Sequence, residues 1–109
     1  MIKLTPNPTF KVEALLPVPG EEKPGAIELT VRWMSRTDRE KWFQAAKDKD
    51  DAEALHEVIA DWAGPVDEAG QPVPYSLDGL RTLCNHYEKV ARSFISAIAQ
   101  GYSEGRVKN

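Results

Sequence analysis

The apolar residues of this chain change their spacing once, near Arg36, and this change constrains the fold more than any other feature. Before it, apolar and polar residues alternate over residues 10–14 and 27–33, which is the period of strands with one buried face. After it, apolar residues recur every three or four positions, as in amphipathic helices. The order predicts an α+β fold: an N-terminal two-stranded antiparallel β-hairpin, followed by a mainly α-helical bundle of three to four helices with a long C-terminal helix.

The predicted hairpin occupies residues 1–34. Between its strands lies the sequence PVPGEEKPG, whose prolines and glycines interrupt a ladder and make a loop longer than a tight turn. Two strands alone are marginally stable in water. Their apolar face is therefore expected to pack on helices or on another subunit.

Two short helices are predicted over residues 37–63. Thr37 and Glu40 have the spacing of a capping box, and Trp42 begins the apolar face of the first helix. The second helix is expected to start at Asp50 or Asp51. Its apolar positions at i, i+3, i+4 and i+7 form one stripe of Leu55, Val58, Ile59 and Trp62.

A proline-rich loop is expected over residues 64–75. Gly64 and Pro65 would stop the second helix, and residues 67–70 can turn. Pro72 and Pro74 would hold an extended approach to the next helix. The apolar residues expected to attach both ends of the loop to the core are Trp62, Val66, Val73 and Tyr75.

The last region, residues 76–105, reads as a long helix capped by Ser76. It has two neighbouring apolar rows: Leu80, Leu83, Tyr87, Val90, Phe94 and Ala97 in one, and Cys84, Ala91, Ile95, Ile98 and Tyr102 in the other. Unbroken from 77 to 104, the rod would be about 42 Å long, against a diameter of about 34 Å for a compact domain of this size. It must bend near Asn85 and His86, or overhang and need a partner.

One of the two rows can be covered by the chain's own strands, and the other is a candidate surface for self-association or for binding a client. The outermost residues, predicted to bind a partner, are Phe94, Ile95, Ile98 and Tyr102. The alternative is that both rows are core. The residues expected to hold the architecture together are Trp33, Trp42, Trp62, Gly64, Tyr75, Ser76, Leu80, Leu83 and Tyr87.

Composition limits the partners and the setting. The 109 residues predict one domain, and a net charge of −3 with a pI near 5.4 argues against nucleic acid. No apolar run is long enough to span a bilayer. A single cysteine, Cys84, cannot form an intramolecular disulfide and favours a reducing, cytoplasmic setting.

Candidate catalytic residues are sparse. His56 lacks the spacing of a metal-ligand pair and reads as a surface histidine, while Cys84 and His86 would lie about 200° apart on a helix. An enzyme would depend on His56, Asp61 and Cys84 alone. We therefore expect no catalysis, no metal and no cofactor.

Several short motifs together resemble the small tail assembly chaperones of tailed bacteriophages and prophages. They are LPVPG at residues 16–20, Trp62 with Gly64, the helix start PYS at residues 74–76, Leu80 and Leu83 before Tyr87, and Tyr102 before Lys108-Asn109. Where relatives often have proline after the equivalent of Tyr87, this chain has Glu88.

The resemblance implies a non-enzymatic protein that binds the tape measure protein, keeps it soluble and helps recruit tail tube subunits. It also implies action in the bacterial host cytoplasm and absence from the mature virion. The homo-oligomer is expected from the second apolar row of the last helix and not from the resemblance. The alternative is a small acidic regulatory or inhibitor protein that binds a host or phage protein.

Overall fold

The computed structural model describes residues 1–104. Three strands and four helices follow in the order β1 (Thr9–Leu16), β2 (Gly25–Arg32), α1 (Arg36–Ala46), α2 (Asp51–His56), β3 (Ile59–Ala63), α3 (Leu77–His86) and α4 (Val90–Glu104). The predicted α+β class is confirmed. The last residue of the predicted 76–105 region and the Lys108-Asn109 motif lie outside the described residues.

The predicted hairpin is present as β1 and β2. They pair antiparallel from Thr9 opposite Arg32 to Leu16 opposite Gly25. Alternate side chains are buried, so one face of the sheet lies on the core. The other face carries charged residues, including an ion pair in which Lys11 Nζ lies 3.6 Å from a Glu28 carboxylate oxygen.

The sheet has a third strand, which corrects the predicted two-stranded hairpin. Residues 59–63, predicted as the second half of a helix, form β3 and pair antiparallel with β2. Helix α2 is only six residues long and ends at His56. The amide of Arg32 donates to the carbonyl of Val58 at 2.8 Å, where the chain enters the strand.

An irregularity in β3 explains why this strand resembles a helix in the sequence. Thr30 pairs with Asp61, but the next residue of β2, Val31, pairs with Ile59, so Ala60 is an extra residue in the ladder. The bulge brings Ile59 and Trp62, three positions apart, to the same buried face. A spacing of three is otherwise typical of a helix.

The helix starts were predicted with mixed success. Helix α1 is capped by Ser35, whose Oγ accepts from the amide of Asp38 at 3.1 Å, so the predicted Thr37 capping box is wrong by two residues. Helix α2 is capped by Asp50, one of the two predicted residues, through a 2.8 Å bond from the amide of Glu53. Ser76 caps α3 as predicted, and its Oγ accepts from the amide of Gly79 at 2.9 Å.

The long C-terminal helix is broken after His86, so the bent alternative is the observed one. Tyr87 has an extended backbone, with φ −126° and ψ 114°, and α4 begins three residues later. The break lets α3 and α4 lie on different sides of the core, with Leu80 and Phe94 both fully buried.

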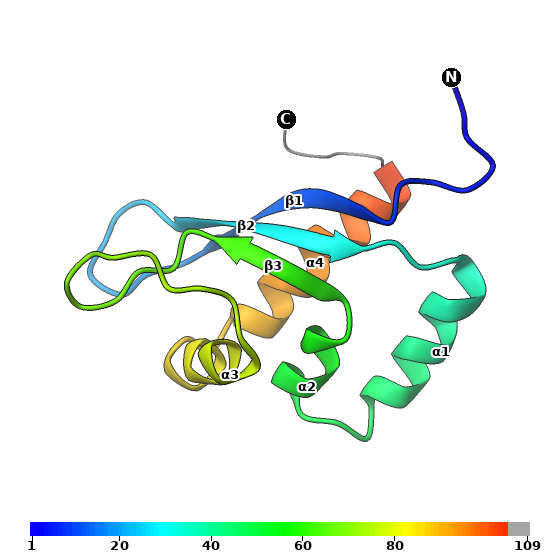
Figure 1. Cartoon of the computed structure of the whole chain (residues 1–109). Coiled ribbons are helices and arrows are strands. Elements are labelled where there is room, and N and C mark those ends of the chain that lie inside the picture. The colour runs from blue at the N-terminus through cyan, green and yellow to red at the C-terminus, as the bar shows by residue number, and fades with distance from the viewer. Residues whose placement is uncertain (105–109) are drawn as a thin grey trace.

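The helices lie on one side of the sheet and form no separate bundle. Helix α4 packs against β1, and α2 and α3 pack beside α4 (Figure 1). Gly101 permits this close approach, because a Cβ added there would lie 2.6 Å from Phe10 Cε2 and 2.7 Å from Val12 Cγ1. The first strand and the last helix therefore share one interface.

The three tryptophans have different surroundings. The indole N–H of Trp42 donates to the carbonyl of Ala54 at 2.9 Å, which ties α1 to α2. Trp62 is buried in the core, whereas Trp33 is at the surface, edge-on to Phe10 and Tyr102.

None of the helices in the described part of the chain has the length and apolar content needed to cross a bilayer.

Candidate functional site

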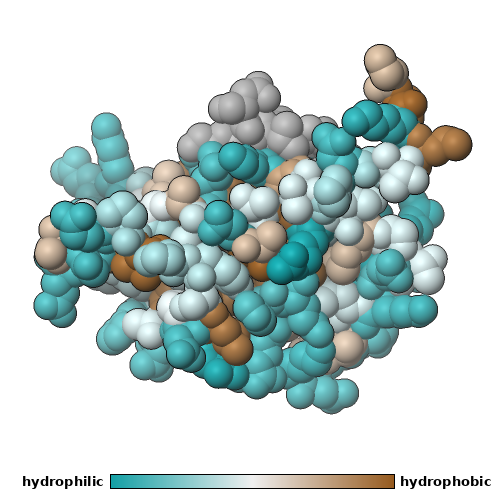
Figure 2. All heavy atoms as spheres, in the orientation of Figure 1, coloured by the Kyte–Doolittle hydropathy of each residue, from teal (hydrophilic) through white to brown (hydrophobic). Residues whose placement is uncertain are grey.

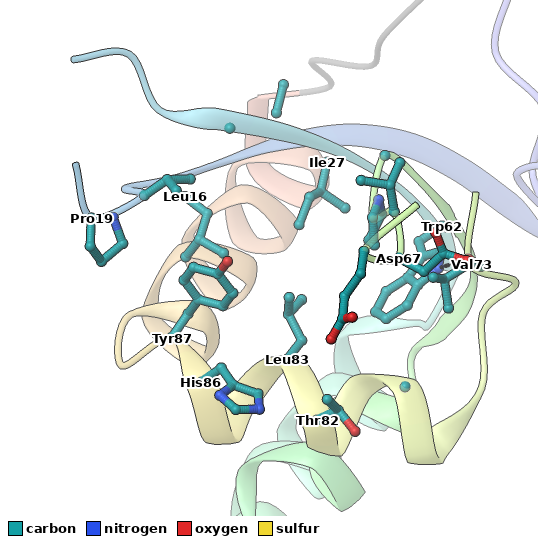
Figure 3. Close-up of a pocket in the computed structure, with 18 of the residues that line it drawn as sticks. Leu16, Pro19, Ile27, Trp62, Asp67, Val73, Thr82, Leu83, His86 and Tyr87 are labelled. Carbon is teal, nitrogen blue, oxygen red and sulfur yellow. Dashed lines mark hydrogen bonds between the residues drawn. The ribbon is translucent and has the colours of Figure 1, made fainter. Parts of the chain in front are cut away.

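A groove of about 1220 Å³ lies at the end of the sheet where β1 finishes. Three segments surround it: the end of β1 with the start of β2, residues 64–69 of the loop after β3, and one face of α3 (Figure 3). We call it the sheet-end groove. Its size exceeds that of many small-molecule pockets, which span about 300–1,000 Å³.

The floor of the sheet-end groove is apolar. Leu16, Ile27 and Trp62 are buried core residues that also line the groove, and Val73 and Leu83 are half-buried beside them. The floor is thus the edge of the hydrophobic core. An apolar surface of this kind suits an apolar partner, because its burial removes further apolar area from water.

The loop wall of the groove is held by its own hydrogen bonds. Asp67 Oδ1 accepts from the amides of Ala69 and Gln71, both at 2.9 Å, and the amide of Gly70 donates to the Asp67 carbonyl. The predicted turn at residues 67–70 is confirmed. The amide of Val73 also donates to the Pro65 carbonyl at 3.0 Å, so the loop is a small closed hairpin.

Most of the residues predicted to attach this loop to the core do so. Trp62, Val73 and Tyr75 pack on the core cluster, and the indole N–H of Trp62 donates to the carbonyl of Val73 at 2.8 Å. The prediction is wrong for Val66, which is 59% exposed. Val66 lines the groove instead, close to the acidic residues Asp67 and Glu68.

Gly64 ends a strand and not a helix, and its position requires glycine. Its φ is +131°, a conformation that residues with a side chain rarely adopt. A Cβ there would also lie 2.8 Å from the carbonyl oxygen of Ala26. The loop can therefore leave the sheet directly beside β2, which shapes the groove.

The helical wall is a face of α3. Thr82 and His86 supply its polar side chains, while Leu83 and Tyr87 are half-buried at the base (Figure 3). The groove is thus apolar at the bottom, acidic on the loop side and polar on the helix side. This arrangement can hold an apolar segment and contact polar groups at its edges.

The loop is attached on its other side through Tyr75. The Tyr75 hydroxyl lies 2.9 Å from Nδ1 of His56, and its ring meets that of Trp62 edge-on with centroids 5.1 Å apart. Burial raises the pKa of Tyr75 to about 12. His56 is exposed, as predicted, and here it helps to fix the loop.

The predicted partner-binding row on the last helix is not an exposed surface. Phe94 is 0% exposed and Ile98 3% exposed, because α4 turns both toward the sheet. Ile95 is half-buried against the same core. The width of the apolar face is explained by β1, α2 and α3, all of which pack against α4. A partner role for these residues stays a prediction.

Tyr102, the fourth residue of that row, packs on the chain itself. Its hydroxyl donates to the Arg32 carbonyl at 2.5 Å, and the Arg39 guanidinium lies 4.5 Å from its ring centroid. Burial raises its pKa. A second, smaller hollow of about 420 Å³ lies here between α1 and α4, beside the exposed Phe43.

The residues on which an enzyme would depend are spread over three elements: His56 on α2, Asp61 on β3 and Cys84 on α3. Burial, aided by the negative charges of Asp51 and Asp50, raises the pKa of the Cys84 thiol to about 11. The thiol is therefore protonated at neutral pH and a poor nucleophile. Within residues 1–104, no group of three His, Cys, Asp or Glu side chains is placed to hold a metal ion.

The groove was not predictable from the sequence, although most of its apolar residues follow a strand or helix pattern. Leu16, Ile27 and Leu83 all read as apolar strand or helix positions. Their meeting at one end of the sheet depends on the path of residues 64–75 and on the break after His86. No local sequence pattern marked Val66 as exposed, and its position beside the groove is seen only in the structure.

One comparison with known proteins gives a match. No curated protein and no solved structure shows significant similarity to the chain. The family model described as phage tail assembly chaperone matches residues 1–109, the whole length of the sequence. The chain therefore belongs to the phage tail assembly chaperone family.

Proposed function

We propose that this chaperone binds the tape measure protein in the sheet-end groove and keeps it soluble while the tail is assembled. Membership of the family supports a chaperone role in tail assembly, and chaperones of this family are generally non-enzymatic. The client and the surface are our proposal. The observation that carries it is the apolar floor formed by Leu16, Ile27, Trp62, Val73 and Leu83.

The chemistry of the groove suits such a client. A long helical protein exposes apolar stripes before assembly, and a groove that buries one face of a helix reads only a few anchor side chains. An open, apolar groove therefore covers many different stripes without demanding one sequence. The same property would let one small chaperone act along a long client.

The further parts of the proposal follow the role of the client. A chaperone bound along a tape measure protein is in a position to help recruit tail tube subunits around it. It would act in the bacterial host cytoplasm and be absent from the mature virion. Binding of several copies along one client would agree with a homo-oligomer.

Co-expression tests the proposal. The tape measure protein from the same locus is produced with and without the chaperone, and the soluble client and the mass of the complex are measured. Val66→Asp places a charge in the groove at a residue that is 59% exposed, so folding is preserved. Phe43→Asp, at a residue 53% exposed outside the groove, is the matched control.

We expect the wild-type protein and Phe43→Asp to keep the client soluble, and Val66→Asp to lose at least half of that effect. A client that stays insoluble and unbound with the wild-type chaperone contradicts the proposal. A client rescued equally by all three proteins contradicts the assignment of the groove.

A second candidate function, inhibition of a host or phage protein through charge, is favoured by the acids Asp67 and Glu68 on the rim. Asp67→Asn with Glu68→Gln removes both charges, and asparagine keeps the acceptor oxygen on which the turn depends. An inhibitor of this kind loses its target on that change and in high salt. A chaperone with an apolar groove keeps its client.

A further inference from the structure

Large apolar side chains are exposed at the other end of the molecule from the groove. Met1, Ile2 and Leu4 are all fully exposed in the segment that precedes β1. In Figure 2 this segment projects from the surface with its hydrophobic residues in brown. Three uncovered apolar side chains within four residues form an exposed apolar group of the kind that is typical of contact sites.

The segment is held away from the chain's own groove. The amide of Trp33 donates to the Pro8 carbonyl at 2.8 Å, which fixes the segment at the start of β1. Leu16, at the other end of that strand, lines the groove. Eight strand residues span about 26 Å, and the segment points away from the sheet (Figure 1). A second copy can reach the groove more directly.

The segment and the groove are chemically complementary. In an extended chain alternate residues point to the same side, so Ile2 and Leu4 share one face and Lys3 takes the other. The groove offers an apolar floor to the first face and the carboxylates of Asp67 and Glu68 to the second. In the free chain Lys3 Nζ bonds Asn7 Oδ1 at 3.0 Å, an exposed contact that a carboxylate can replace.

We propose that residues 2–4 of one copy insert into the sheet-end groove of a second copy. The donor segment and the groove are different surfaces of the chain, so the contact is head-to-tail and repeats from copy to copy. Such contacts give rings when the rotation closes and filaments when it does not. The assembly would therefore grow with protein concentration.

This inference rests on the groove of the proposed function but not on its client. If both are correct, the segment of a neighbouring copy and the tape measure protein compete for one surface. Empty chaperones would cover each other's apolar floors until a client displaces the segment. The competition would protect the groove from other apolar partners.

The test measures mass against protein concentration for the purified full chain, by sedimentation velocity from about 5 to 500 µM. The donor variant is Ile2→Asp with Leu4→Asp, outside the core, and the groove variant is Val66→Asp. Phe43→Asp is again the control, because it adds the same charge at an exposed apolar residue elsewhere. Circular dichroism checks that all variants fold.

We expect the mass of the wild type and of Phe43→Asp to rise with concentration. Loss of two buried anchors weakens association at least about tenfold, so the donor and groove variants stay smaller at every concentration. Lys3→Glu and Glu68→Lys each weaken association, and the two changes together restore part of it, because the attraction is re-formed with opposite signs.

A wild-type protein that is monomeric throughout overturns the inference, as does a donor variant that assembles like the wild type. The proposed function and this inference are contradicted by different results. A monomeric wild type that still solubilises the tape measure protein leaves the function standing, whereas an assembling wild type that cannot solubilise it leaves only the inference.

Discussion

The indole N–H of Trp62 donates a 2.8 Å hydrogen bond to the carbonyl oxygen of Val73, so a buried strand residue holds the far end of the loop. Trp62→Phe keeps most of the apolar contact but leaves the carbonyl without this donor. We expect a loss of about 1–2 kcal/mol in the free energy of unfolding. Urea denaturation measures the loss, and faster hydrogen exchange at the Val73 amide reports the loosened loop.

Trp33→Phe is the matched control for that change. Trp33 stands at the surface against Tyr102, with ring centroids 5.3 Å apart, and phenylalanine can keep an edge-on contact. A change within about 0.5 kcal/mol is expected. Equal losses for the two variants would show that the hydrogen bond contributes nothing specific.

Gly64→Ala is expected to destabilise the domain for two reasons. The φ of +131° strains any residue with a side chain, and the new Cβ would lie 2.8 Å from the Ala26 carbonyl oxygen. Gly70→Ala separates the backbone strain from the steric clash. Gly70 has a φ of +79°, but nothing lies within 4 Å of the added carbon. Thermal unfolding should show about 1 kcal/mol for Gly70→Ala and more for Gly64→Ala. The reverse order would contradict the close approach of the loop to β2.

Phe94→Ala tests whether α4 is core. The Phe94 side chain is fully buried, so its removal should leave a cavity and cost about 3–5 kcal/mol. Phe43→Ala removes the same ring where it is 53% exposed and should cost less than about 1 kcal/mol. A small effect of Phe94→Ala in the purified protein would mean that this ring faces a partner and not the core.

The raised pKa of Cys84, about 11, predicts slow modification of its thiol. The thiolate is the reactive form, and burial keeps it a minority species in the folded protein at pH 8–9. A disulfide reagent should react faster in denaturant than in buffer. The pKa of the Cys84 thiol is higher in the folded protein than in the unfolded one. The contribution of the protonated thiol to the free energy of unfolding is therefore complete below about pH 9 and is lost as the pH rises toward 11. A thiol that reacts equally fast in both states would contradict its burial.

The sequence predicted those elements whose local pattern has one interpretation. The alternation in residues 10–14 and 27–33 fixed the hairpin, and the Ser76 cap fixed the start of α3. Strand β3 was missed because its bulge at Ala60 places Ile59 and Trp62 at a helical spacing. The local pattern could not reveal that β2 needed a partner on its free edge.

The site was less predictable than the fold for a related reason. Periodicity identified the apolar residues of α4 but could not say what would cover Phe94 and Ile98, which depends on how the helix crosses β1. The exposed groove residues carry no periodic signal, since Val66 and Glu68 lie in a loop. These loop residues come close to the other groove residues only when the chain is folded.

Because Gly101 lies close to Phe10 and Val12, the interface between β1 and α4 cannot form until the end of α4 has been synthesised. The strand emerges from the ribosome before the helix that covers it. Until the final turns of that helix leave the exit tunnel, the apolar side of the nascent hairpin has no permanent cover. A truncated protein that lacks these turns would expose core residues of the sheet to water. Proteases and holdases would recognise it as unfolded.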